Sequence, residues 1–163
     1  MKRGSLLLIL LALTLLLSAC GASSGKNKSI TKADLQTALK SYEVELNTVD
    51  SGKNVTQFTI TASEVNADKL MNRSYVKEAY ELSMTNPGKT TYGHYQVLRG
   101  FGPVMAVLGM IDTTPSGSFD NDAFIGELLD VICDGKAHSE AGWTITAKVD
   151  EQNNTITITG TCQ

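Results

Sequence analysis

The amino-acid sequence predicts a mixed α+β fold, in which several helices pack on one face of a small antiparallel sheet that ends in a C-terminal β-hairpin. Three observations support this fold class. Apolar residues recur at helical spacing in several segments between residues 31 and 133. Residues 143–162 instead alternate between apolar and polar side chains on both sides of a polar turn. The polar face of these two strands is typical of a solvent-facing sheet surface and consists of Thr144, Thr146, Thr155, Thr157 and Thr159.

The first 19 residues are interpreted as an export signal that precedes the fold. Lys2 and Arg3 give a cationic start, and residues 6–17 form an uncharged, leucine-rich run. This run is shorter than the ~20 residues that a membrane-spanning helix needs, and small residues follow it. Cleavage is therefore favoured over a permanent transmembrane anchor.

Small residues and a cysteine end the apolar run, in the order Leu17, Ser18, Ala19 and Cys20. This stretch resembles the lipobox of bacterial lipoproteins, in which the cysteine receives diacylglycerol and becomes the mature N-terminus. The resemblance implies that Cys20 anchors the protein to a membrane on its extracytoplasmic side, at the cell surface or in the periplasm. Two or three acyl chains suffice for this, because each buried methylene contributes about 0.8 kcal/mol. An ordinary secretory signal with an incidental cysteine is the alternative.

The segment that follows Cys20 is expected to be a flexible tether. Residues 20–29 contain, after the cysteine, no apolar residue larger than alanine. Residues 30–163 then form a single extracytoplasmic domain that is long enough for its own core. Removal of residues 1–19 takes away two of the 14 basic residues and leaves 12 against 17 acidic ones. This negative balance argues against nucleic acid as a partner.

The domain begins with an expected helix from Thr31 to Val49. Thr31 and Asp34 match a capping box, and the polar residues 50–54 are interpreted as the stop signal. Apolar residues follow at intervals of three and four, namely Leu35, Leu39, Tyr42, Leu46 and Val49. Residues 58–62 then alternate as a half-buried strand does.

Helices are also expected to fill the middle of the domain. One runs from about Ala67 to Met84, with Met71, Tyr75, Ala79 and Leu82 on one side. Residues 92–111 are strongly apolar, and Gly100 to Pro103 divides them into two helical pieces. Residues 120–133 form the last helix, which Asp120 or Asn121 caps.

Two cysteines of the domain predict a disulfide. Cys133 lies at the end of the last helix, and Cys162 shares the inward face of the returning strand. Export would place both in an oxidising compartment, so we expect a Cys133–Cys162 bond. Closing a loop of about 30 residues would stabilise the fold by roughly 3–4 kcal/mol. Two free thiols or a redox pair are the alternative.

The sequence contains no recognisable catalytic or metal-binding motif. His94 and His138 lack a partner histidine, cysteine or carboxylate at metal-ligand spacing, which favours surface or hydrogen-bonding roles. Asp120, Asn121 and Asp122, with Glu127, invite a calcium hypothesis, but the EF-hand pattern is missing and acids at a helix start already serve capping. No catalytic residue, metal or cofactor is therefore predicted.

Aromatic residues offer a candidate ligand-binding site. The rings of Tyr92 and Tyr95 combine a flat apolar surface with a polar edge, which suits a sugar or a peptide. Nearby glycines and a proline favour a non-regular segment in which such side chains face a cleft. Core packing is the alternative role for these and the other aromatic residues.

Three functions follow from these observations. The first is a lipid-anchored, non-catalytic module of the cell envelope that binds a protein, a peptide or a small ligand. The second is a carrier or receptor for a small apolar ligand, because residues 97–111 could line a cavity as well as fill a core. The third is an envelope-acting hydrolase that uses acidic residues such as Glu43, Glu45 or Asp120.

Overall fold

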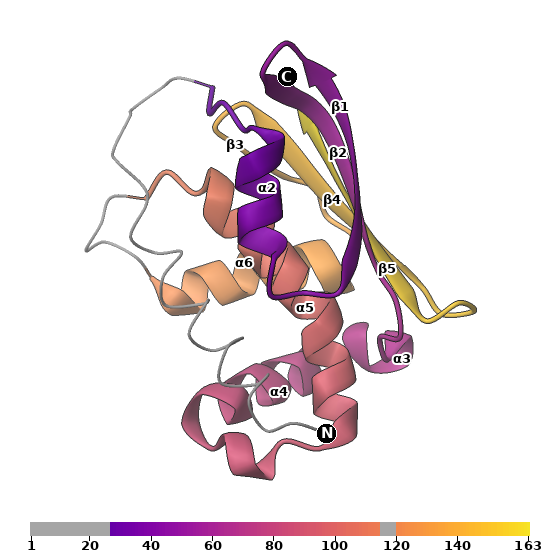
Figure 1. Ribbon diagram of the computed structural model, residues 1–163. Helices are drawn as coiled ribbons and strands as arrows, with labels where there is room; N and C mark the ends of the chain where they lie inside the picture. Colours follow the sequence, from indigo (N-terminus) through magenta and orange to yellow (C-terminus); the bar gives the residue numbers. More distant parts are fainter. Residues whose placement is uncertain (1–26, 115–119) are drawn as a thin grey trace.

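The computed structural model describes residues 27–114 and 120–163 of the chain. Within these residues, five α-helices and a five-stranded antiparallel sheet form the predicted α+β fold (Figure 1). All the helices lie on one side of the sheet, as expected (Figure 1). The export signal, the lipobox and Cys20 lie outside the described residues.

The sheet has one apolar face and one face rich in hydroxyl groups. Its strands, in spatial order, are β1 (Val44–Ser51), β2 (Asn54–Ala62), β5 (Thr155–Cys162), β4 (Trp143–Asp150) and β3 (His138–Glu140). On the inner face Ile60, Ile145 and Ile158 are fully buried. On the outer face Thr159 pairs with Thr59 on one side and with Thr146 on the other. The predicted C-terminal hairpin and its threonine-rich face are thus confirmed.

The first expected helix is wrong over its second half. Helix α2 spans only Lys32–Leu39, and the residues from Val44 onward form the edge strand β1. The capping box at its start is confirmed, because Thr31 Oγ1 accepts from the Asp34 amide at 3.2 Å and the Asp34 carboxylate accepts from the Thr31 amide at 2.8 Å. Residues 50–54 turn the β1–β2 hairpin, with Gly52 at φ +64°, and so do not end a helix.

The second expected helix is divided into α3 (Ala67–Leu70) and α4 (Arg73–Thr85). The side-chain oxygen of Asn72 accepts a hydrogen bond from the Tyr75 amide at 3.1 Å and thereby starts α4. Asparagine caps a helix well, so this local bond overrides the apolar periodicity that runs through the junction. Met71, which was assigned to the buried side, is 43% exposed there.

Residues 92–111 form one continuous helix, α5 (Tyr92–Ile111), and the predicted division at Pro103 is wrong. A proline inside a helix costs about 3 kcal/mol or more, because it removes a backbone hydrogen bond and crowds the preceding turn. Each large apolar side chain that is fully buried contributes about 1.5–3 kcal/mol, which offsets this cost. The almost completely buried side chains of α5 include Phe101, Val104, Val107, Leu108 and Ile111.

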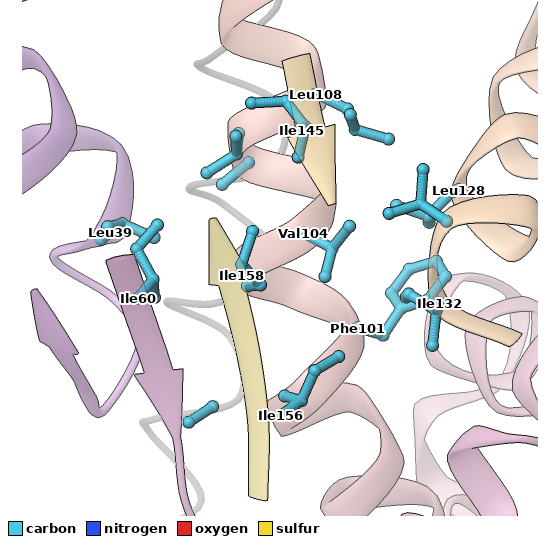
Figure 2. Close-up of a cluster of buried hydrophobic side chains, with 14 of the residues drawn as sticks. Leu39, Ile60, Phe101, Val104, Leu108, Leu128, Ile132, Ile145, Ile156 and Ile158 are labelled. Carbon is cyan, nitrogen blue, oxygen red and sulfur yellow. The ribbon is translucent and has the colours of Figure 1, made fainter. Parts of the chain in front are cut away.

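The core lies between the sheet, α5 and α6 (Asn121–Cys133). Figure 2 shows Val104 of α5 between Ile158 of the sheet and Leu128 of α6. Residues 97–111 therefore fill the core with their apolar side chains. Among the described residues, no helix combines the length and the apolar character that crossing a membrane requires.

The chain enters the domain earlier than the sequence indicates. The Lys28 amide donates to the Ala141 carbonyl at 2.8 Å, and Trp143 Nε1 donates to the Lys28 carbonyl at 2.7 Å. The Val55 amide donates to the Ile30 carbonyl at 2.8 Å. Residues 27–29, which were assigned to the tether, thus belong to the domain, and residues 21–26 separate them from Cys20.

Candidate functional site

A polar pocket of about 340 Å³ opens where the end of α5 meets the start of α6 and strand β3. This volume lies at the lower end of the range typical of small-molecule sites, ~300–1,000 Å³. The pocket is lined by Leu108, Asp112, Thr114, Asp120, Ala123, Phe124, Glu127, His138, Ser139 and Glu140. Among these described lining residues, four carry carboxylates and none is a lysine or an arginine. The pocket therefore favours groups that donate hydrogen bonds or carry positive charge.

Strand β3 places His138 and Glu140 side by side. It pairs with β4 through the two-residue turn Ala141–Gly142, whose φ angles of 49° and 78° are typical of a type I′ hairpin. Side chains two residues apart in a strand share one face. His138 Nε2 accordingly lies 3.3 Å from Glu140 Oε2.

Glu140 connects β3 to the segment that follows α5. Its Oε1 accepts a hydrogen bond from the Thr113 amide at 2.8 Å and a second one from the Thr113 hydroxyl. Its Oε2 contacts the ring of His138. Because both carboxylate oxygens are engaged, the orientation of Glu140 in the pocket wall is fixed.

Glu127 approaches the other side of the histidine ring from α6. Its Oε2 lies 3.7 Å from His138 Nδ1, which is within ion-pair distance but too long for a hydrogen bond. The side chain of His138 is only 17% exposed. The imidazole thus lies between two carboxylates that come from different elements.

Asp112 and Asp120 border the pocket, and both have local structural roles. Asp112 Oδ1 accepts from the Thr114 amide at 2.7 Å. Asp120 Oδ1 accepts from the amides of Asp122 and Ala123, which confirms its predicted role as the N-cap of α6. In the described part of the chain, no three His, Cys, Asp or Glu side chains are grouped so that they could hold a metal ion.

Neither Ser139 nor His94 acts with His138. Ser139 points to the opposite face of β3, where its hydroxyl lies 2.9 Å from the Thr144 hydroxyl. His94 is buried, and its Nδ1 accepts from the Thr91 amide at 3.1 Å in the capping box of α5. This confirms the predicted hydrogen-bonding role of His94.

Tyr92 and Tyr95 lie at the other end of α5. Sixteen residues separate Tyr92 from Leu108, which corresponds to about 24 Å along a helix. Tyr92 is 64% exposed, and the hydroxyl of Tyr95 accepts from the Thr90 hydroxyl at 2.9 Å. Both belong to the first turn of a regular helix, so the expectation of a non-regular segment is wrong.

Cys133 and Cys162 are free thiols, and the predicted disulfide is absent. Cys133 Sγ lies 3.1 Å from the Leu70 carbonyl, and Leu70 packs beside Ile156 at Gly100. Cys162 lies six residues after Ile156 in β5, which corresponds to about 20 Å along the strand. Cys162 does face inward, as expected, but toward the other end of the core. Burial raises the pKa of the Cys133 thiol to about 11, against the opposing charge of Arg73.

Thr113 and Glu140 were not among the residues expected to have a function, and Glu127 was expected only as a possible calcium ligand. The spacing of His138 and Glu140 before an Ala-Gly turn is a usable signal of a short strand with both side chains on one face. Thr113 and Glu127 come close to His138 and Glu140 only because separate elements pack together. No local sequence pattern predicts that proximity.

Comparison with known proteins adds no further constraint on function. No protein-family model matches the chain, and no match was found among curated proteins or solved structures.

Proposed function

We propose that this chain is a lipid-anchored, non-catalytic module on the outer side of a bacterial membrane, and that its pocket binds a positively charged group of an envelope partner. The observation that carries the proposal is the arrangement of Glu127, His138 and Glu140 in the wall of a polar pocket. The resemblance of Leu17 to Cys20 to a lipobox supports the anchor and its location.

The chemistry of the pocket favours an ammonium or guanidinium group. Hydrogen bonds from such a group to a carboxylate are short and contribute about 1.5–3 kcal/mol. Thr113 holds Glu140 in place before any ligand arrives, which lowers the entropy cost of binding. A peptide that carries a basic side chain, or a small amine, therefore fits the site.

The carrier hypothesis was based on residues 97–111, which were expected to line a cavity or fill a core. Their apolar side chains pack in the core, so this basis for a carrier is removed. The pocket has one large aliphatic lining residue, Leu108, among the described residues, so its surface favours polar ligands.

The hydrolase hypothesis is also less well supported than binding. Glu43 contacts the guanidinium of Arg99, which also bonds Glu64 at 3.2 Å. Glu45 is exposed in the edge strand, and Asp120 caps α6. Glu43 and Glu45 therefore lie at the start of β1, whereas Asp120 lies at the start of α6, and no contact joins the three acids into one site in the described residues.

A titration followed by amide NMR tests the pocket. The probes are trilysine and, as the matched control, triglutamate, added to the full mature chain. We expect trilysine to shift the amides of residues 112–114, 123–127 and 138–140. We expect Glu127→Gln to weaken its binding about tenfold or more, the equivalent of one charge-assisted hydrogen bond.

The matched control variant is Glu151→Gln, which changes an exposed turn residue between β4 and β5. Its spectrum and its affinity for trilysine should equal those of the wild type. Equal affinity for trilysine and triglutamate, or shifts confined to another surface, would contradict the proposed binding site.

A further inference from the structure

The polar pocket contains a group that can acquire a positive charge of its own. Its described lining residues include four carboxylates, no lysine or arginine, and the imidazole of His138. Histidine is the side chain whose charge ordinarily changes between about pH 5 and 8. Protonation of His138 therefore determines whether the pocket already holds a cation when a ligand arrives.

The two ring nitrogens of His138 face carboxylates from two different elements. Nε2 lies 3.3 Å from Glu140 Oε2 in β3, and Nδ1 lies 3.7 Å from Glu127 Oε2 in α6. A neutral imidazole has one N–H group and can donate to only one of these carboxylates, whereas an imidazolium has two N–H groups. The protonated ring can therefore pair with both carboxylates at once.

Glu127 is the carboxylate that is open to a change of partner. Its side chain is 52% exposed, and within residues 27–114 and 120–163 no group donates a hydrogen bond to it. Glu140, by contrast, already accepts two hydrogen bonds from Thr113. An ammonium group of a ligand and the imidazolium of His138 would therefore compete for Glu127.

The other charged groups near the ring do not supply a competing cation. Asp112 follows α5 and Asp120 caps α6, and each carboxylate accepts from a backbone amide in the wall of the same pocket. Lys136 precedes β3, but its ammonium group lies 3.1 Å from Asp130 and 3.4 Å from Asp134. Among the described lining residues, His138 alone can therefore change the charge of the pocket from negative toward neutral near pH 6.

We infer that protonation of His138 blocks cation binding in this pocket, so that the ligand binds at neutral pH and is released in mildly acidic surroundings. This inference rests on the proposed cation-binding function and adds the regulation of the same site. Because a proton on His138 and a cationic ligand compete for Glu127, each weakens the binding of the other by the same factor.

Calorimetric titration of the full mature chain at pH 7.5 and pH 5.5 tests this competition. The probe is N-acetyltrilysine amide, whose ammonium groups keep their charge over this range because the α-amino group is blocked. We expect its Kd to rise about tenfold at pH 5.5, within the limit of tenfold per pH unit that one competing proton sets. Carboxylic acids ordinarily stay ionised down to pH ~5, so a loss of this size requires a histidine.

Two histidine variants separate the pocket from the rest of the chain. His138→Gln keeps a hydrogen-bonding side chain that does not titrate, and it should bind the probe equally at both pH values. His94→Gln is the matched control, because glutamine three residues after Thr91 can still complete the capping box of α5. This control should show the same pH dependence as the wild type.

The ring signals of the two histidines in NMR spectra give a second readout that needs no substitution. Saturating probe should move the midpoint of the His138 titration to lower pH and leave that of His94 unchanged. A Kd that is equal at both pH values in the wild type, or an equal loss of affinity in His138→Gln, would overturn the regulation alone. Absence of binding at either pH would overturn the proposed cation site and, with it, its regulation.

Discussion

At the scale of single residues, Gly160 is required by the packing of the aromatic pair behind it. A β-carbon at this position would lie 2.1 Å from the ring of Phe58. That ring is buried, and its centroid is 5.5 Å from that of Trp143. The ring has no free space into which it can move, because Trp143 is itself buried and bonded to Lys28.

Gly160→Ala is therefore expected to destabilise the domain by about 1–3 kcal/mol, the usual cost of overpacking a core. Gly126→Ala is the matched control, because nothing lies within 4 Å of its added β-carbon and alanine favours a helix by about 0.5–1 kcal/mol. Urea unfolding followed by the fluorescence of Trp143, the single tryptophan, measures both. Equal midpoints for the two variants would contradict the packing account.

Expectations about single residues were confirmed where the interaction joins residues that are close together in the sequence. The capping box of Thr31 and Asp34 and the cap by Asp120 depend on three or four consecutive residues, and both are confirmed. The disulfide failed because it depends on the distance between two elements. Inward orientation of Cys162 was predictable from alternation along β5, but its position along the core relative to Cys133 was not.

At the scale of elements, an ion-pair network fastens α4 to the C-terminal end of α6. Arg73 contacts Asp130 and Asp134, both at 2.8 Å, and Lys136 approaches the same two carboxylates. The hydrogen bond from Arg73, followed by that from Lys136, lowers the pKa of Asp130.

A carboxyl group whose pKa is lower in the folded state stabilises the fold above the pKa of the unfolded chain. That contribution is lost as the pH falls through the folded pKa of Asp130. Asp130→Asn should therefore lower the melting temperature at pH 7, and the difference from the wild type should shrink as the pH falls past the ordinary value of 3.8 and vanish only below the lower folded pKa of Asp130. Thermal unfolding across this pH range, with Glu151→Gln as the control, makes the measurement. A constant difference at all pH values would show that the loss is not electrostatic.

Residues 44–49 were wrongly expected to be helical because their apolar residues fit both a helical and a strand periodicity. Leu46 and Val49 continue a helical spacing from Tyr42, but Val44, Leu46 and Thr48 also alternate as the inner face of β1. Pairing with β2 decides between the patterns, and residues 50–54 serve equally as a helix stop or a hairpin turn. Pro103 was overestimated as a breaker, because the core packing around α5 offsets its local cost.

At the scale of the whole molecule, one-sided packing explains the fold class. A single helical layer covers one face of the sheet, so one strand face is apolar and the other carries threonine, which the alternation in residues 143–162 made predictable. The pocket was not predictable as a unit, because its walls come from α5, α6 and β3, which packing brings together. The described part of the chain begins beside Trp143, whose Nε1 donates to the Lys28 carbonyl.

Mass analysis of the N-terminal peptide of the mature protein, isolated from a bacterial membrane fraction, tests the lipid anchor most directly. We expect a peptide that begins at Cys20 and carries the added mass of diacylglycerol on the cysteine sulfur. We also expect Cys20→Ser to accumulate as the uncleaved precursor. A mature chain that begins after residue 20, or one that retains an unmodified Cys20, would contradict membrane anchoring.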